Sequence, residues 1–196
     1  KVKLVQVVFD ILPSSLGKGI SSKCVKGVGL YCFPTQSSKD TITPASSLMK
    51  KKKTAVLWIH GGGRILGSSG NCVDCMTVSK IISLLDVPVL SADYRKAPAH
   101  PFPAGLDDVV AAYHWLVKEL SKDGDHENIR IIVAGESAGG GLAAELCQRL
   151  LDEKIQPLPV AQCLIQPMLD DRTCVDPEIN QLSPHLIWNN TSNMYA

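Results

Sequence analysis

One segment of the chain constrains its fold more than any other: Gly135-Glu136-Ser137-Ala138-Gly139, which has the form G-x-S-x-G. The run from Ile129 to Ala134 directly before it is continuous and apolar, which is typical of a strand buried on both faces. Residues 137–151 directly after it have the spacing of an amphipathic helix. A serine between such a strand and such a helix must occupy a tight turn, and a side chain at either flanking glycine would collide with the neighbouring elements. The segment therefore predicts a strand–turn–helix unit.

The segments around this unit indicate an α/β fold. Apolar runs predict further strands at 26–33, 55–59, 87–94 and 160–165, and helical spacing of apolar residues predicts helices at 77–85 and 106–120. Strands that alternate with helices predict a mostly parallel sheet with helices on both faces. We interpret residues 1–53 as an N-terminal region with the first strands and a cap remnant, and residues 54–196 as the core of the fold.

Composition excludes several classes of function. The net charge is +1, with 20 basic and 19 acidic residues, so nothing suggests nucleic-acid binding. No apolar stretch approaches the ~20 residues that a membrane span requires. Seven scattered cysteines favour reduced thiols in an intracellular, cytoplasmic protein. Asn189 and Asn190 each begin a glycosylation acceptor pattern, which is typical of secreted proteins, so localisation stays open.

Two glycine-containing motifs point to acyl-transfer chemistry. Ser137 would present its hydroxyl above the sheet as a nucleophile, at the N-terminus of a helix whose amides favour developing negative charge. His60-Gly61-Gly62-Gly63 follows another buried strand, and glycines allow backbone N–H groups to approach a reacting oxygen closely. No G-K-[ST] follows these glycines, which excludes a phosphate-binding loop. We therefore predict an oxyanion hole formed by the N–H groups of Gly61, Gly62 and Ala138.

Four segments together resemble the hormone-sensitive lipase family of α/β-hydrolases: WIHGGG at 58–63, DYRKAPAHPFPAGLDD at 93–108, GESAGG at 135–140 and QPMLDDR at 166–172. The resemblance implies an α/β-hydrolase fold and hydrolysis of a small-molecule ester by a Ser–Asp–His triad, with no metal and no organic cofactor. It further implies that several residues support the nucleophile and the oxyanion loop: His60, Gly63, Gly135, Glu136 and Gly139, together with Asp93, Tyr94, Arg95 and His100.

The chain departs from the family pattern at two positions. Glu136 replaces an aspartate, which conserves charge, and Arg64 stands where an apolar residue usually follows HGGG, which puts the shape of the acyl pocket in doubt. Asp170 and Asp171 are carboxylates in a family segment that precedes the triad acid, so we do not assign them to catalysis. Cys72 and Cys75 have C-x2-C spacing but lack a second pair, and surface thiols are the better interpretation than a zinc site.

The triad partners of Ser137 are not found in the sequence. In this fold the order along the chain is Ser, then Asp or Glu, then His. His185 is the only histidine after Ser137, and it comes before the region where the family places the acid. We therefore expect a truncated chain that lacks the last strands, exposes a strand edge at 160–165 and is inactive alone. Two alternatives stay open: a non-catalytic, hormone-receptor-like module that binds a small molecule, and a truncated product without a function of its own.

Overall fold

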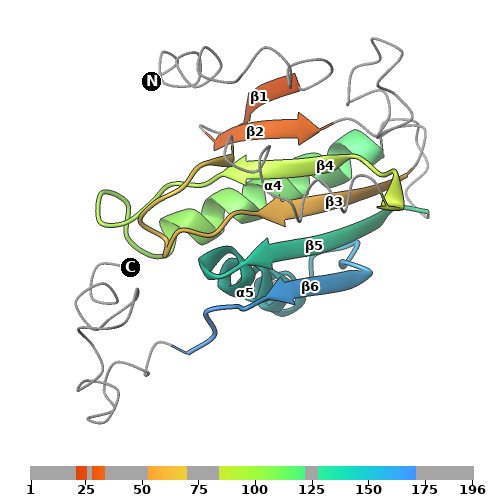
Figure 1. Ribbon diagram of the computed structural model, residues 1–196. Coiled ribbons are helices and arrows are strands. Elements are labelled where there is room, and N and C mark those ends of the chain that lie inside the picture. Colours follow the sequence, from red (N-terminus) through yellow and green to blue (C-terminus); the bar gives the residue numbers. More distant parts are fainter. Residues whose placement is uncertain (1–20, 26–27, 34–52, 70–83, 122–127, 171–196) are drawn as a thin grey trace.

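The computed structural model describes residues 21–25, 28–33, 53–69, 84–121 and 128–170 (Figure 1). Six strands in this part of the chain form one sheet in the order β1-β2-β4-β3-β5-β6. Their bounds are β1 Ser21–Val25, β2 Val28–Phe33, β3 Thr54–Ile59, β4 Val89–Asp93, β5 Arg130–Glu136 and β6 Ala161–Ile165. Strands β4, β3, β5 and β6 are parallel, whereas β1 and β2 are antiparallel to their neighbours. The predicted α/β class with a mostly parallel sheet is confirmed.

The two central strands place the candidate site. β3 and β5 pair in register from Thr54 opposite Arg130 to Ile59 opposite Gly135. Most side chains of both strands are buried, as their continuous apolar sequences predict. Because the strands are parallel and end at the same level, the segments after Ile59 and after Glu136 leave the sheet side by side. The two motifs, 75 residues apart in the sequence, therefore lie next to each other at the carboxyl ends of the central strands.

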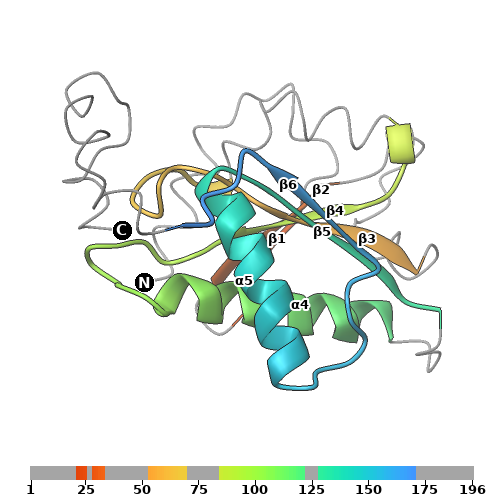
Figure 2. The same ribbon diagram turned by 90° about the horizontal axis from the view of Figure 1, so that it is seen from below.

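Two helices, α4 (Ala104–Leu120) and α5 (Ala138–Asp152), pack against the same face of the sheet (Figure 2). The side chains of α4 at Val109, Tyr113 and Leu116 are fully buried, which follows from their i, i+4, i+7 spacing. The predicted helices at 106–120 and 137–151 are confirmed within a few residues. Of the helix predicted at 77–85, residues 84 and 85 are helical and the others lie outside the described residues.

Strand β1 was not predicted from the sequence. Its sequence, SSKCV, has no clear alternation of apolar and polar residues, and it is placed by antiparallel pairing with β2, from Ser21 opposite Cys32 to Val25 opposite Val28. Both strands belong to the same sheet as the core, and a domain boundary after residue 53 stays a prediction. The apolar stretch at 2–9 lies outside the described residues.

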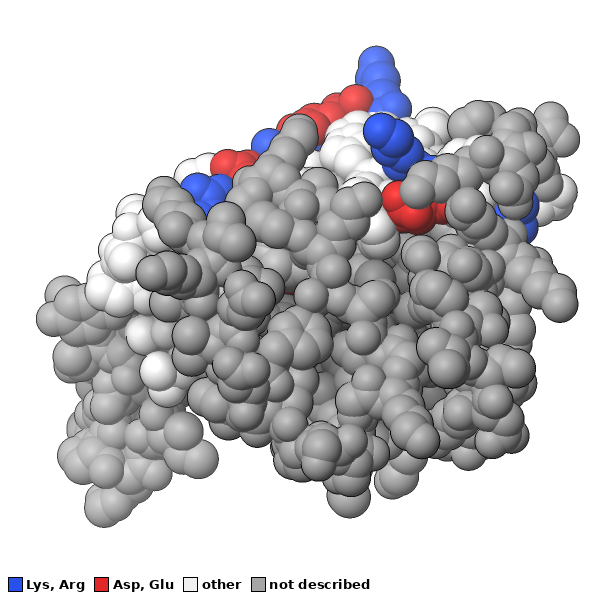
Figure 3. Space-filling model, turned by 90° about the horizontal axis from the view of Figure 1, so that it is seen from above, with Lys and Arg blue, Asp and Glu red and all other residues white. Residues whose placement is uncertain are grey.

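The described surface carries charges of both signs. On the face seen in Figure 3, basic and acidic side chains of the described residues alternate along one border, which agrees with the net charge of +1. Within the described ranges, α4 and α5 are too short or too polar to cross a membrane, and no other helix meets the requirement.

Candidate active site

Ser137 occupies a strained turn between β5 and α5. Its backbone has φ 55° and ψ −121°, a region that side-chain-bearing residues rarely adopt and that persists only when the surroundings hold it. Three main-chain hydrogen bonds do so. The N–H of Ser137 donates to the carbonyl of Ile165 at 2.8 Å, and the Ser137 carbonyl accepts from Gly141 and Met168, each at 3.1 Å. The serine at the centre of the G-x-S-x-G motif is thus presented by strand, helix and the segment after β6 together.

The glycines on either side of Ser137 are required by close approach of backbone atoms. A Cβ atom on Gly135 would lie 2.3 Å from the carbonyl oxygen of Gly139. A Cβ atom on Gly139 would lie 2.1 Å from the carbonyl oxygen of Ile59, at the end of β3. Contacts under 3 Å between a Cβ and a backbone oxygen cannot be accommodated, so no other residue fits this geometry. The helix after Ser137 can begin where it does because these two positions lack side chains.

The glycine loop after β3 lies directly against Ser137. A Cβ atom on Gly61 would lie 3.4 Å from the Cβ of Ser137. Gly62 has φ 110°, and its carbonyl accepts the N–H groups of Ile65 and Leu66 at 3.1 and 2.8 Å, which closes a tight turn. A Cβ on Gly62 would lie 2.2 Å from the carbonyl oxygen of Leu66. The turn therefore requires a glycine at this position and fixes the backbone beside the serine.

The N–H groups predicted to form the oxyanion hole are not used by the rest of the described structure. Within the described ranges, no hydrogen bond occupies the backbone N–H of Gly61, Gly62 or Ala138. Ala138 is the first residue of α5, where the first N–H groups of a helix have no partner inside it. Backbone donors of this kind are suited to an anion. Stabilisation of a tetrahedral oxyanion would need backbone donors of this kind close to the nucleophile.

His60 and Tyr94 support the glycine loop from beneath. The ring of His60 is 5% exposed and stacks on Tyr94 with 4.4 Å between ring centroids. Its Nδ1 lies 2.7 Å from the carbonyl oxygen of Gly61. The hydroxyl of Tyr94 donates to the carbonyl of His60 at 3.0 Å. His60 is therefore engaged by the loop itself, and its supporting role in catalysis stays a prediction.

The carboxylate of Asp93, the last residue of β4, lies beside His60, the first residue after β3. Its carboxylate accepts a hydrogen bond from Lys96 Nζ at 2.9 Å and lies 3.8 Å from His60 Nε2. Burial raises the pKa of the Asp93 carboxyl, but the contacts with His60 and Lys96 together lower it by more, so the pKa falls below its usual value of 3.8. The carboxylate is therefore held in its charged form beside His60.

Arg95 and Asp108 fix the loop that follows β4 to helix α4. Asp108 is 3% exposed and accepts hydrogen bonds from the Arg95 backbone N–H, Nε and Nη2 at 2.8–3.0 Å. The hydrogen bonds to Asp108 raise the pKa of the Arg95 guanidinium. His100, in the same loop, is exposed and donates its backbone N–H to Lys96. These contacts agree with a structural role for the Asp93–Asp108 segment.

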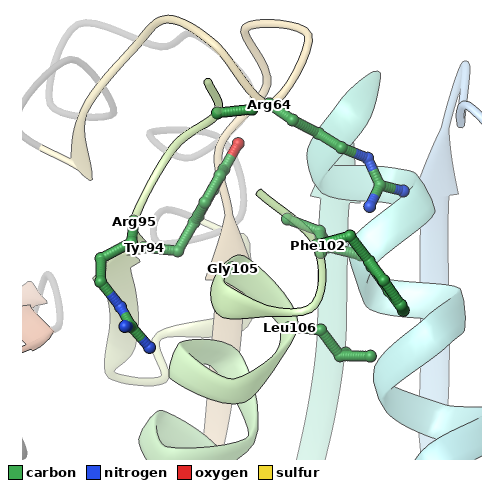
Figure 4. A pocket seen from close by; sticks show the side chains of 8 residues that line it. Arg64, Tyr94, Arg95, Phe102, Gly105 and Leu106 are labelled. Carbon is green, nitrogen blue, oxygen red and sulfur yellow. The ribbon is translucent and has the colours of Figure 1, made fainter. Parts of the chain in front are cut away.

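Arg64 makes a contact that sequence reasoning missed. Its guanidinium forms an ion pair with both carboxylate oxygens of Glu145 on α5. Figure 4 shows the side chain extending from the glycine loop toward α5, above Phe102, over a pocket that Tyr94, Leu106 and Leu142 also line. The two partners are 81 residues apart, so no local pattern in the sequence relates them.

Of the remaining residues that the sequence singles out, some lie outside the described residues and others are placed by the structure. Asp171, His185, Cys72 and Cys75 lie outside the described residues, and Asp170 is exposed after β6. Gly63 is buried in the turn after Gly62, and Glu136 is the last residue of β5. In the part of the chain that the structure covers, no three His, Cys, Asp or Glu side chains gather as metal ligands.

The sequence profile of the family described as alpha/beta hydrolase fold matches residues 56–195. Carboxylic ester hydrolase LipN of Mycobacterium tuberculosis is 38% identical over 122 residues, which are 59% of this chain and 31% of the relative. Rabbit (Oryctolagus cuniculus) arylacetamide deacetylase is 35% identical over 152 residues, 69% of this chain and 38% of the relative. Ethyl acetate hydrolase of Pseudomonas putida is 33% identical over 128 residues, 65% and 39% of the two chains. The matched part thus spans about a third of these relatives.

Solved structures have the same fold. Esterase LipW from Mycobacterium marinum superposes with a TM-score of 0.67 at 24% identity, over 98% of this chain and 55% of its own. A bacterial heroin esterase superposes with a TM-score of 0.64 at 27% identity, over 98% and 57% of the two chains. The strand order, the serine turn and the glycine loop described above therefore lie on a known scaffold.

Proposed function

Because the chain belongs to the hormone-sensitive lipase-like family of α/β-hydrolases, we propose that its protein hydrolyses carboxylic esters through an acyl-enzyme intermediate on Ser137. The observation that carries this proposal is the position of Ser137. Its backbone is held at φ 55°, directly after β5, and the neighbouring loop is so near that a Cβ added to Gly61 would lie 3.4 Å from the Ser137 Cβ. A strained serine opposite a glycine loop is the arrangement that acyl transfer requires.

In the first half of the reaction, the Ser137 hydroxyl attacks the ester carbonyl carbon and its proton passes to a general base. The carbonyl oxygen becomes an oxyanion, which we assign to the N–H groups of Gly61, Gly62 and Ala138. Each such donor contributes roughly 10²–10³-fold to the rate in related chemistry. Collapse of the tetrahedral intermediate expels the alcohol, which takes up a proton, and leaves the acyl group on Ser137.

In the second half, water attacks the acyl carbon, the acid is released and Ser137 is regenerated. A general base must remove a proton from the serine and then from the water, and in this fold that base is a histidine oriented by a carboxylate. His60 is committed to the loop carbonyl of Gly61 and to Tyr94, and His100 and His114 are exposed. We therefore assign none of these three histidines as the base.

We propose small-molecule esters as the substrates. The relatives include proteins named for ethyl acetate and for arylacetamide, both of which carry an acetyl or comparably small acyl group. Their names favour short-chain acyl esters, so p-nitrophenyl acetate and butyrate are suitable first substrates. Neither a metal nor an organic cofactor has a part in the proposed steps.

The test is labelling of the full-length protein with a fluorophosphonate probe, which reacts only with an activated serine. We expect labelling and p-nitrophenyl acetate hydrolysis, both abolished in Ser137→Ala, with a drop in kcat of at least about 10⁴-fold. A folded full-length protein that is neither labelled nor active would instead support the alternative of a module that binds a small molecule without cleaving it. Labelling that survives in Ser137→Ala would show that another serine is the nucleophile.

A further inference from the structure

We propose that the Arg64–Glu145 ion pair is a positioning device that holds the oxyanion loop at its working distance from Ser137. The inference rests on the proposed function and adds a residue to it: Arg64 neither contacts the reacting atoms nor replaces a donor. It fixes the turn from which Gly61 and Gly62 would present their N–H groups.

The backbone of Arg64 is itself held in an unfavourable conformation. It has φ 61°, in the left-handed region, although it is not a glycine. Residues in this region cost free energy and persist only where neighbouring contacts impose them. Here the Arg64 carbonyl accepts the N–H of Ala97 at 3.0 Å, and the following two residues donate to Gly62. The left-handed backbone directs the arginine side chain away from the loop and toward α5 (Figure 4).

The ion pair is bidentate and partly shielded from water. Arg64 Nη1 lies 3.3 Å from Glu145 Oε2, and Nη2 contacts Oε1. The two side chains are 19% and 33% exposed. Two parallel hydrogen bonds between a guanidinium and a carboxylate set orientation as well as distance, which a single point charge does not. This geometry suits a contact that has to define where a loop lies.

The guanidinium of Arg64 also lies close to the start of α5. Its Nη2 lies 3.4 Å from the place that a Cβ on Gly141 would occupy. The guanidinium therefore rests against the first turn of the helix that begins directly after Ser137. Glu145 is one turn further along the same helix, so the arginine connects the loop to the element that carries the serine. A Cβ on Gly141 would itself lie 2.3 Å from the carbonyl oxygen of Met168, and that contact is what requires a glycine at this position.

A shift of the loop would act on the rate of the chemical step. Hydrogen-bond donors to an oxyanion must be placed within a fraction of an ångström, and a 1 Å misplacement costs on the order of 10²-fold. Because the donors act mainly on the transition state, their displacement lowers kcat and leaves KM nearly unchanged. This split separates a positioning role from substrate binding, which would raise KM.

The test uses four variants of the full-length protein with p-nitrophenyl acetate. In Arg64→Met, which keeps the apolar stem, and in Glu145→Gln, we expect kcat to fall about 10- to 100-fold with KM within about twofold. The double variant should lose no more than either single one, because both remove the same contact. Arg149→Met is the matched control. It removes the ion pairs of Arg149 with Glu153, the residue after α5, and with Asp107 of α4, both away from the loop, and should leave kcat unchanged.

Hydrogen exchange provides a readout that needs no activity. The backbone amides of Ile65 and Leu66 donate to the Gly62 carbonyl. Their hydrogens should exchange faster in Arg64→Met and Glu145→Gln than in the wild type, and their exchange rates in Arg149→Met should equal those of the wild type. If the wild type neither hydrolyses esters nor reacts with the fluorophosphonate, the proposed function falls, and faster exchange would still support the loop contact. The inference is overturned by unaltered exchange, by additive losses in the double variant, or by a raised KM at constant kcat.

Discussion

Ser137 and its two glycine neighbours show how much of the site depends on single residues. The serine carries the backbone strain, and Gly135 and Gly139 remove the atoms that would prevent it. Neither glycine could be replaced by alanine without moving the β5–α5 turn. A conventional judgement from helix propensity would reach the opposite conclusion for Gly139, because alanine is the better helix former.

Gly139→Ala separates these two views. Helix propensity alone predicts that the variant gains about 1 kcal/mol of stability. The new Cβ would lie 2.1 Å from the Ile59 carbonyl oxygen, which is backbone and cannot move aside, so we expect a loss of about 2–3 kcal/mol instead. Urea unfolding of the wild type and the variant measures the difference.

Gly105→Ala in the first turn of α4 is the graded control for this substitution. Its Cβ would lie 3.1 Å from the carbonyl oxygen of Arg95, a tight contact that small shifts relieve, so its effect should be close to zero. Equal free energies of unfolding for the two alanine variants would contradict the account of Gly139.

Strand ends are the next scale at which the site is organised. β3 and β4 are parallel neighbours, and their ends carry His60 and Asp93. Lys96, from the loop after β4, completes the cluster. The glycine loop is thus supported by an aromatic stack and by a carboxylate whose charge is stabilised on two sides. The glycine loop and the end of β4 are held together because His60, Asp93 and Lys96 interact with one another.

Asp93 gives this cluster a pH dependence. Its pKa is lowered in the folded protein, so its carboxylate stabilises the fold above the unfolded-state value of 3.8, and this contribution is lost as the pH falls through the lower folded value. We expect Asp93→Asn to be less stable than the wild type at pH 7, and the two free energies of unfolding to converge as the pH is taken well below 3.8. Urea titrations at a series of pH values measure this.

Asp152→Asn, at the exposed end of α5 beside the neutral Gln148, is the matched control for Asp93→Asn. At pH 7 this substitution should change the free energy of unfolding less than Asp93→Asn does, because the Asp152 side chain is exposed and bonds to a neutral amide. A constant gap between Asp93→Asn and the wild type at all pH values would contradict a charge-dependent role for Asp93.

At the scale of the whole molecule, sequence patterns predicted the elements but not their cross-contacts. The strands at 54–59, 89–93, 130–136 and 161–165 and both helices were predictable because burial on two faces or one stripe leaves a periodic signal. β1 left no such signal. The Arg64–Glu145 pair was also unpredictable, because two surface charges 81 residues apart are matched by the way the chain folds and by nothing local.

Two cysteines of the described part of the chain differ in burial, and we therefore expect them to differ in reactivity. Cys147 on α5 packs against the core, and burial raises the pKa of its thiol above the usual 9.0, which reduces the reactive thiolate. Cys163 on β6 is exposed. At pH 8, iodoacetamide should label Cys163 of this chain faster than Cys147, as read by peptide mass spectrometry. The difference should vanish in guanidinium chloride, and faster labelling of Cys147 in the native state would refute this packing.

The hydrogen bonds of Ser137 have a consequence for the order in which the protein is made. The serine's N–H and carbonyl are bonded to Ile165 and Met168, which are synthesised roughly 30 residues later, a delay of a few seconds at about 5–20 residues per second. Until that segment has left the ribosome, two of the three bonds that hold the strained turn do not exist. We therefore expect the nascent chain to form its β5–α5 unit first and the hydrogen bonds of Ser137 with the segment after β5 and α5 later.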